Sequence, residues 1–101
     1  MATVIVTESN LEEIKASDKT VLLDFYADWC VPCKRLGPVL EDISEENPDI
    51  IVGKINVEDE PDIAEEFGIM SVPTLIVLKY GDEADKVVGF RTKAQILDLL
   101  D

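Results

Sequence analysis

Histidine is absent from this sequence, and positive charge is scarce. The 101 residues include 9 Lys and Arg against 22 Asp and Glu, so the formal net charge is −13. Without imidazole groups the chain has no histidine ligand for a metal, no histidine general base and no Ser-His-Asp triad. A chain this acidic also repels phosphate backbones and anionic lipid. We therefore expect no nucleic-acid binding and no role at a membrane surface.

Long apolar runs and secretory signals are missing as well. No stretch reaches the roughly 20 apolar residues that a membrane-spanning helix needs. The N-terminus lacks a basic segment, and Glu8 ends its apolar run too early for a signal peptide. We therefore expect a cytoplasmic protein in a reducing compartment. In such a compartment, a close pair of cysteines is more often catalytic or metal-binding than structural.

The residues that are present describe one globular α/β domain. Apolar residues form 47% of the chain, and no repeat or linker divides it, so residues 1–101 are expected to fold as a single domain. Hydrophobic patterning gives the order βαβαβ followed by αββα, which is typical of layered α/β domains. The last two strands are connected too tightly for a crossover, so the sheet is mixed. The predicted strands are Thr3–Val6, Val21–Ala27, Ile50–Val57, Thr74–Tyr80 and Asp85–Gly89.

Capping residues indicate where two of the four predicted helices begin. Ser9 with Glu12, and Thr92 with Gln95, each have the spacing of a capping box. A third helix is predicted from apolar residues at helical spacing, and a fourth from a proline at its start and a glycine at its end. These two segments are Pro32–Glu46 and Pro61–Gly68.

The segment that carries chemistry is Cys30-Val31-Pro32-Cys33. It lies where a predicted buried strand ends and a helix begins, at the edge of the sheet where α/β folds place their sites. Backbone N–H groups and the helix dipole at that position favour the thiolate of Cys30. Cys33 follows one turn later and can close a small disulfide loop. The pattern therefore predicts reversible dithiol–disulfide chemistry.

Three other interpretations of the cysteine pair stay open. A zinc half-site needs two more ligands, which only a second chain sharing the metal can supply. A structural disulfide across two residues stabilises little, because the loop that it closes is tiny. Two inert buried thiols are the third interpretation, and their place at a helix start disfavours it.

Asp24 is unusual because it interrupts an apolar predicted strand. Burial raises the pKa of a carboxyl group, so Asp24 can hold a proton, accept one from Cys33 and later return it. Lys54, in the neighbouring predicted strand, is its expected ionic partner. The alternatives are a carboxylate solvated at a bend and a lysine whose ammonium group reaches the surface. Trp29 is either a core residue or a shield for the adjacent thiol.

The sequence around the two cysteines resembles the active-site region of the thioredoxin family. Further matching segments are Lys54-Ile55-Asn56-Val57, Phe67-Gly68-Ile69, Val72-Pro73-Thr74 and Val88-Gly89-Phe90. The resemblance implies the thioredoxin fold, a three-layer α/β/α arrangement with a five-stranded mixed sheet in the order 1-3-2-4-5 and four flanking helices. It also implies a protein-disulfide reductase that works without a bound cofactor or metal.

The resemblance further implies the roles of individual residues. Cys30 attacks a target disulfide, Cys33 resolves the mixed disulfide, and Asp24, modulated by Lys54, accepts the proton. Partners are disulfide-containing target proteins and a thioredoxin reductase or equivalent electron donor, with the chain acting as a monomer. Val72-Pro73 corresponds to the family's cis-proline pair, although an ordinary trans proline at a strand start is the alternative. The implied docking surface consists of Trp29, Val31, Pro32, Val72, Pro73, Val88 and Gly89.

Val31 and the excess of acidic residues both bear on the expected redox activity and on the choice of partners. Val31 stands where the family usually has glycine, so a β-branched side chain borders the site. Two alternatives are a disulfide isomerase or oxidase whose potential Val31 has retuned, and a peptide-binding module that uses the same groove. The many carboxylates predict a solubilising surface, with steering of basic partners or adaptation to high salt as alternatives. Lys34 and Arg35 are expected to keep the site itself less negative.

Overall fold

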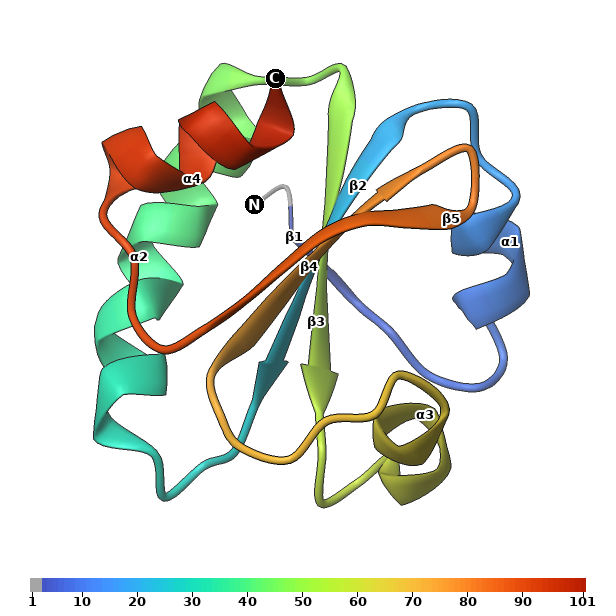
Figure 1. Cartoon of the computed structure of the whole chain (residues 1–101), viewed down its shortest axis with the longest axis vertical. Coiled ribbons are helices and arrows are strands. Elements are labelled where there is room, and N and C mark those ends of the chain that lie inside the picture. The colour runs from blue at the N-terminus through green and yellow to red at the C-terminus, as the bar shows by residue number, and fades with distance from the viewer. Residues whose placement is uncertain (1–2) are drawn as a thin grey trace.

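A five-stranded mixed sheet forms the middle layer of the structure, a computed structural model that describes residues 3–101 (Figure 1). Its order is β1-β3-β2-β4-β5; β3 is parallel to β1 and β2, whereas β4 is antiparallel to both β2 and β5. The predicted sheet order and the predicted fold class are therefore confirmed. The strands are β1 (Thr3–Ile5), β2 (Thr20–Tyr26), β3 (Ile50–Asn56), β4 (Thr74–Lys79) and β5 (Asp82–Val88).

The helices cover the two faces of the sheet and create two apolar cores. In Figure 1, α2 and α4 lie on one side of the sheet and α1 and α3 on the other. Successive side chains of β2 alternate between these cores, as the pleat of a strand requires. Leu22 shares a core with Leu36 of α2, whereas Leu23 shares one with Ile63 of α3. Asp24 therefore lies on the α2 side. The helices are α1 (Leu11–Lys15), α2 (Val31–Glu46), α3 (Pro61–Glu66) and α4 (Lys93–Leu100).

Most predicted boundaries agree with the structure to within one or two residues, but the last strand begins earlier than predicted. β5 starts at Asp82 rather than Asp85, because the turn between β4 and β5 is very short. Tyr80 and Gly81 both have positive φ, at 54° and 83°, and the ladder resumes directly with Lys79 opposite Asp82. A turn this tight extends the antiparallel pair by three residues.

The prediction of a capping box at Ser9 is wrong. Helix α1 begins one residue later, after Asn10, and no side chain caps its first turn. Asn10 instead accepts a hydrogen bond from the backbone N–H of Thr7 at 2.8 Å, and the hydroxyl of Thr7 lies 2.8 Å from that of Ser9. These local bonds compete with the cap. The box at Thr92 is formed, with both reciprocal hydrogen bonds present.

A search of residues 3–101 finds no helix with the length and apolar character needed to cross a bilayer.

Candidate active site

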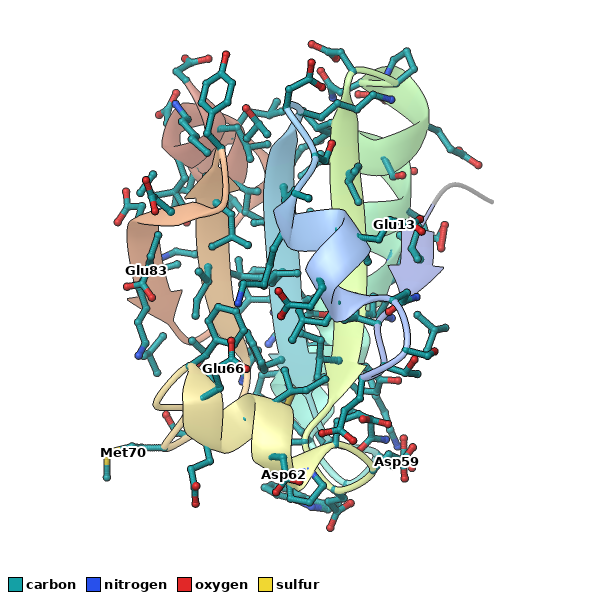
Figure 2. All side chains as sticks on the ribbon, turned by 90° about the vertical axis from the view of Figure 1, so that its right-hand side faces the viewer. Glu13, Asp59, Asp62, Glu66, Met70 and Glu83 are labelled. Atoms are coloured by element: carbon teal, nitrogen blue, oxygen red, sulfur yellow. A yellow bond between two sulfur atoms is a disulfide. The ribbon has the colours of Figure 1, made fainter. Side chains whose placement is uncertain are left out.

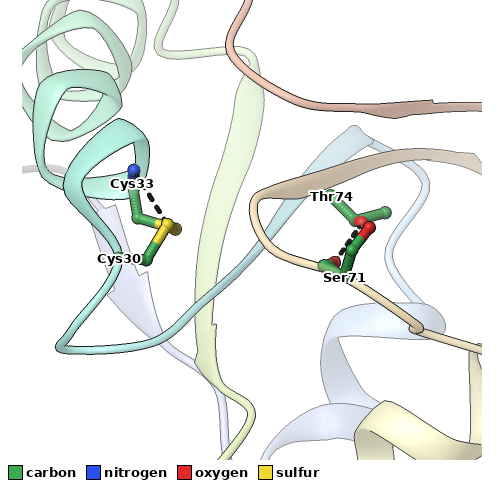
Figure 3. Close-up of a disulfide and its surroundings, with 4 residues drawn as sticks. All are labelled: Cys30, Cys33, Ser71 and Thr74. Atoms are coloured by element: carbon green, nitrogen blue, oxygen red, sulfur yellow. Dashed lines mark hydrogen bonds between the residues drawn. A yellow bond between two sulfur atoms is a disulfide. The ribbon is translucent and has the colours of Figure 1, made fainter.

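The cysteine pair occupies the N-terminus of α2, where β2 delivers the chain to the edge of the sheet. Cys30 is the N-cap residue, and its Sγ accepts a hydrogen bond from the backbone N–H of Cys33 at 3.2 Å (Figure 3). Pro32 lies in the first turn, where a helix loses no hydrogen bond to proline. The two cysteines form a disulfide with their Cα atoms 5.2 Å apart. The segment thus holds one sulfur at the helix N-terminus, as predicted.

The disulfide is covered by its neighbours but bordered by exposed side chains. Cys30 and Cys33 are 3% and 5% exposed, and they pack with Val72 among other apolar residues. Trp29 and Val31 are 68% and 65% exposed. Trp29 is therefore not a core residue, and a partner that approaches the sulfur atoms meets these two side chains first.

Two further chain segments are brought to the disulfide by the sheet. The Val72–Pro73 peptide bond is cis, and the loop is held by the hydroxyl of Thr74, which donates to Ser71 O at 2.7 Å. Figure 3 shows this loop facing the cysteines across the end of the sheet. Pro73 O in turn accepts a hydrogen bond from Gly89 N at 2.8 Å. Gly89 has a φ of 96°, which favours glycine there.

All residues predicted for the docking surface therefore come together at one end of the molecule. They come from the start of α2 and the residue before its N-cap, from the loop before β4, and from the end of β5 with the residue that follows it. Among them, Val88 is also exposed, whereas Pro73 is buried. They are Trp29, Val31, Pro32, Val72, Pro73, Val88 and Gly89.

A shallow groove beside Trp29 adds residues that the sequence did not indicate. It has a volume of about 180 Å³ and is lined by apolar side chains around the loop before the cis-proline. Met70, at its rim, is 95% exposed. The sequence offered one indication of this groove: Ile69 and Met70 are apolar residues in a loop just before Val72-Pro73. The lining residues are Trp29, Val57, Ile69, Met70, Ser71 and Val72.

Asp24 is a buried carboxyl group without a hydrogen bond. It is 1% exposed, and neither of its oxygens has a partner within the described residues. Burial raises the pKa of Asp24 to about 7, although the positive charge of Lys54 lowers it in part. The burial of Asp24 agrees with the expectation of a buried carboxyl and not with the alternative of a solvated bend, whereas its role as a proton acceptor stays a prediction.

Lys54 lies opposite Asp24 in the ladder between β2 and β3, on the same face of the sheet. In residues 3–101 the two side chains form no ion pair within 4 Å. Lys54 therefore acts on Asp24 through attraction over a longer distance, and not through the direct ion pair that the sequence suggested. The Lys54 ammonium lies 5.0 Å from the centroid of the Tyr26 ring. It also lines a cavity of about 240 Å³ together with Cys33 and Gly37. The cavity connects the surroundings of Lys54 with the inner cysteine.

This arrangement is suited to thiol–disulfide exchange, in which cysteine sulfurs carry the electrons and a nearby carboxyl group can take up a proton. The thiolate of Cys30 is favoured by the helix N-terminus, and Asp24, a carboxyl group whose pKa is about 7, lies on the same side of the sheet. Over the described range, residues 3–101, no three metal-ligating side chains come close enough to hold an ion together.

Comparisons with known proteins agree with the fold and the cysteine pair. The thioredoxin family model matches residues 2–101. The chain is 46% identical over 105 residues to a thioredoxin from Staphylococcus haemolyticus, covering 100% of this chain and 97% of the relative. It is 43% identical over 96 residues to a thioredoxin from Chlamydia caviae, covering 95% and 93%. A solved structure of a mutant thioredoxin from Halobacterium salinarum matches with a TM-score of 0.91 and 35% identity, covering 97% of this chain and 87% of that one.

Proposed function

The chain belongs to the thioredoxin family and is a protein-disulfide reductase, and on this premise we propose the role of each site residue. The observation that carries the proposal is the placement of Cys30 at the N-cap of α2, with Cys33 one turn further on. The same face of the sheet holds Asp24, whose pKa is close to neutral. These positions support two successive thiol–disulfide exchange steps.

In the first step, the thiolate of Cys30 attacks one sulfur of the target disulfide. The target S–S bond breaks, its electron pair leaves with the second target sulfur, and Cys30 becomes joined to the target. The N–H of Cys33 and the positive end of the α2 dipole favour the thiolate that starts this step.

In the second step, Cys33 resolves the mixed disulfide. Its thiol loses a proton to the Asp24 carboxylate, and the resulting thiolate attacks Cys30 Sγ. The bond between Cys30 and the target breaks, and the target sulfur leaves as a thiolate. Two electrons have then passed to the target, and the protein is left with the Cys30–Cys33 disulfide. Cys33 and Lys54 line one cavity, and the charge of Lys54 acts on Asp24, so the two observations together support this proton route.

Target docking is assigned to the residues that border the disulfide at this end of the molecule. Trp29, Val31 and Pro32 border it on one side, Val72 and Pro73 on the other. Val72 lies outside the β4 ladder, which begins at Thr74, so its backbone is free to pair with an extended target segment. Val88 and Gly89 complete the surface beside this loop.

The remaining parts of the proposal follow the family. No bound cofactor takes part, and a thioredoxin reductase or an equivalent donor returns two electrons to the Cys30–Cys33 disulfide. The protein acts in the cytoplasm as a monomer, and residues 1–101 form one domain. The match of the family model to residues 2–101 supports the last point.

A trapping experiment tests the two cysteine roles. Cys33→Ser is expected to form a stable 1:1 mixed disulfide with a disulfide-containing protein, which dithiothreitol releases. Cys30→Ser, the matched control, is expected to form none. If both variants hold the target equally and without a covalent bond, the chain uses the groove as a peptide-binding module and the assigned roles are wrong.

A further inference from the structure

Two of the nine cations of this acidic chain, both arginines, lie together on one flank of the docking surface. Arg35 lies over the ring of Phe90, with its guanidinium carbon 4.9 Å from the ring centroid. Arg91 donates from Nη1 to Val88 O and to Phe90 O, each at 3.0 Å. Figure 1 shows why they meet: the loop between β5 and α4 passes beside the first half of α2. We call Arg35 and Arg91 the basic flank; Lys34 is not part of it, because it lines a cavity together with Asp28.

The basic flank keeps its charge. Within residues 3–101 neither of its two arginines forms an ion pair with a carboxylate, whereas Lys15 and Lys93 do. Both guanidinium groups are held by a ring or by backbone carbonyls, which fix their position without neutralising them. Fixed, uncompensated guanidinium groups bind carboxylates well, because little side-chain entropy is lost on binding.

The opposite flank of the same surface is acidic. The amide of Asn56 donates to Asp28 at 3.4 Å, and its oxygen accepts from the backbone N–H of Glu58 at 2.9 Å. It thereby joins the loops that follow β2 and β3. Figure 2 shows Asp59 and Asp62 at the end of the molecule that also carries Met70. We call Asp28, Glu58, Asp59 and Asp62 the acidic flank.

We propose that the docking surface selects targets by the order of their charges. A target segment is preferred when it places a carboxylate against the basic flank and none against the acidic flank. This inference rests on the proposed function, because the segment must carry the disulfide that Cys30 attacks. The partner chemistry is thus a disulfide flanked on one side by Asp or Glu.

Screening explains why the net charge does not cancel this preference. At physiological salt the Debye length is about 8 Å, so carboxylates elsewhere on the surface act weakly on a docked segment. Charges on the two flanks lie close to the docked segment and are screened less. At low salt, the net charge of −13 repels acidic targets as a whole, and the local preference is partly hidden.

The test uses short peptides with one cysteine joined to thionitrobenzoate, whose coloured release reports reduction of this mixed disulfide by the protein. The peptides carry Glu, Lys or Ser either two residues before or two residues after the cysteine. In one of the two placements, we expect the Glu peptide to react about threefold faster than the Lys peptide with the reduced wild type, the size of effect that an exposed charge pair has. In the other placement, next to the acidic flank, the order is reversed.

Matched charge changes locate the effect. The double variant Arg35→Gln, Arg91→Gln removes the preference, and Arg35→Glu, Arg91→Glu reverses it. The control Lys19→Glu, Lys79→Glu has the same charge change as the latter at the other end of the sheet, where both lysines donate only to backbone carbonyls. It should leave the ratio of Glu to Lys rates unchanged.

Two outcomes overturn the inference in distinguishable ways. If the Ser peptide reacts readily but the ratio of Glu to Lys rates is the same in wild type, both double variants and the control, charge order plays no part. If the Ser peptide reacts no faster with wild type than with Cys30→Ser, the proposed function itself fails, and the inference with it.

Discussion

The two faces of the sheet are filled by the same strands but with different chemistry. On the face covered by α1 and α3, β2 and β3 contribute Leu23, Phe25 and Ile55 to an apolar core. On the face covered by α2 and α4, the same strands contribute Asp24 and Lys54 below the cysteine pair. Asp24 is the one charged side chain that is buried within residues 3–101. The first face therefore contributes mainly apolar packing, whereas the second buries a carboxyl group at a cost in stability.

Moving a carboxyl to the apolar face gives the largest expected effect. Leu23→Asp places a charge in a core with no cation, and we expect it to lower the free energy of unfolding at pH 7 by about 4 kcal/mol or more. Urea unfolding measures this, with Leu23→Ala as the control for lost volume. A variant that folds at pH 4 but not at pH 7 meets the same expectation. Equal losses for the Asp and Ala variants contradict it.

Removing the carboxyl from the active-site face has the opposite effect. The pKa of Asp24 is about 7 in the folded protein against an ordinary value of 3.8, so ionisation favours the unfolded chain. The stability that this group retains below pH 4 is lost as the pH rises through 7. Asp24→Asn should therefore stabilise the oxidised protein by about 4 kcal/mol at pH 8 and by little at pH 4. Unfolding curves at the two pH values test this, and a pH-independent difference contradicts it.

Removing the charge of Lys54 gives the smallest expected effect, which is confined to the pH dependence of one reaction step. Its charge lowers the pKa of Asp24, so Lys54→Met raises that pKa further and leaves fewer carboxylates at pH 7. We expect release of the mixed disulfide to slow severalfold at pH 7 and to recover at higher pH. Single-turnover pH profiles measure this, with Lys79→Met, at the far end of the sheet, as the control. Equal profiles for the two variants assign Lys54 to structure instead.

Features that depend on neighbours in the sequence were predictable, and features that depend on distant contacts were not. The apolar run of β2, the position of Cys30 at a helix start and the capping box at Thr92 are local patterns. The box at Ser9 failed because Thr7 and Asn10 offered competing local bonds of similar strength.

The candidate site shows the same division. The burial of Asp24 was predictable, because a strand that is apolar along its whole length is buried on both faces, and so is any acidic residue within it. The groove at Met70 depends on how the loop before the cis-proline packs against Trp29. The contact between Arg35 and Phe90 joins α2 to the loop after β5, and no sequence pattern links these segments. Both arise only once the sheet order has placed the loops side by side.

The exposure of Trp29 has a spectroscopic consequence. It is the only tryptophan in the chain, it precedes Cys30 directly, and it is 68% exposed. A disulfide beside an excited indole quenches its emission by accepting an electron, whereas a dithiol does so much less. Oxidation and reduction of the cysteine pair should therefore change the fluorescence intensity without any attached label. Titration in glutathione or dithiothreitol buffers then gives the midpoint potential, and stopped-flow mixing gives the rate of each half-reaction.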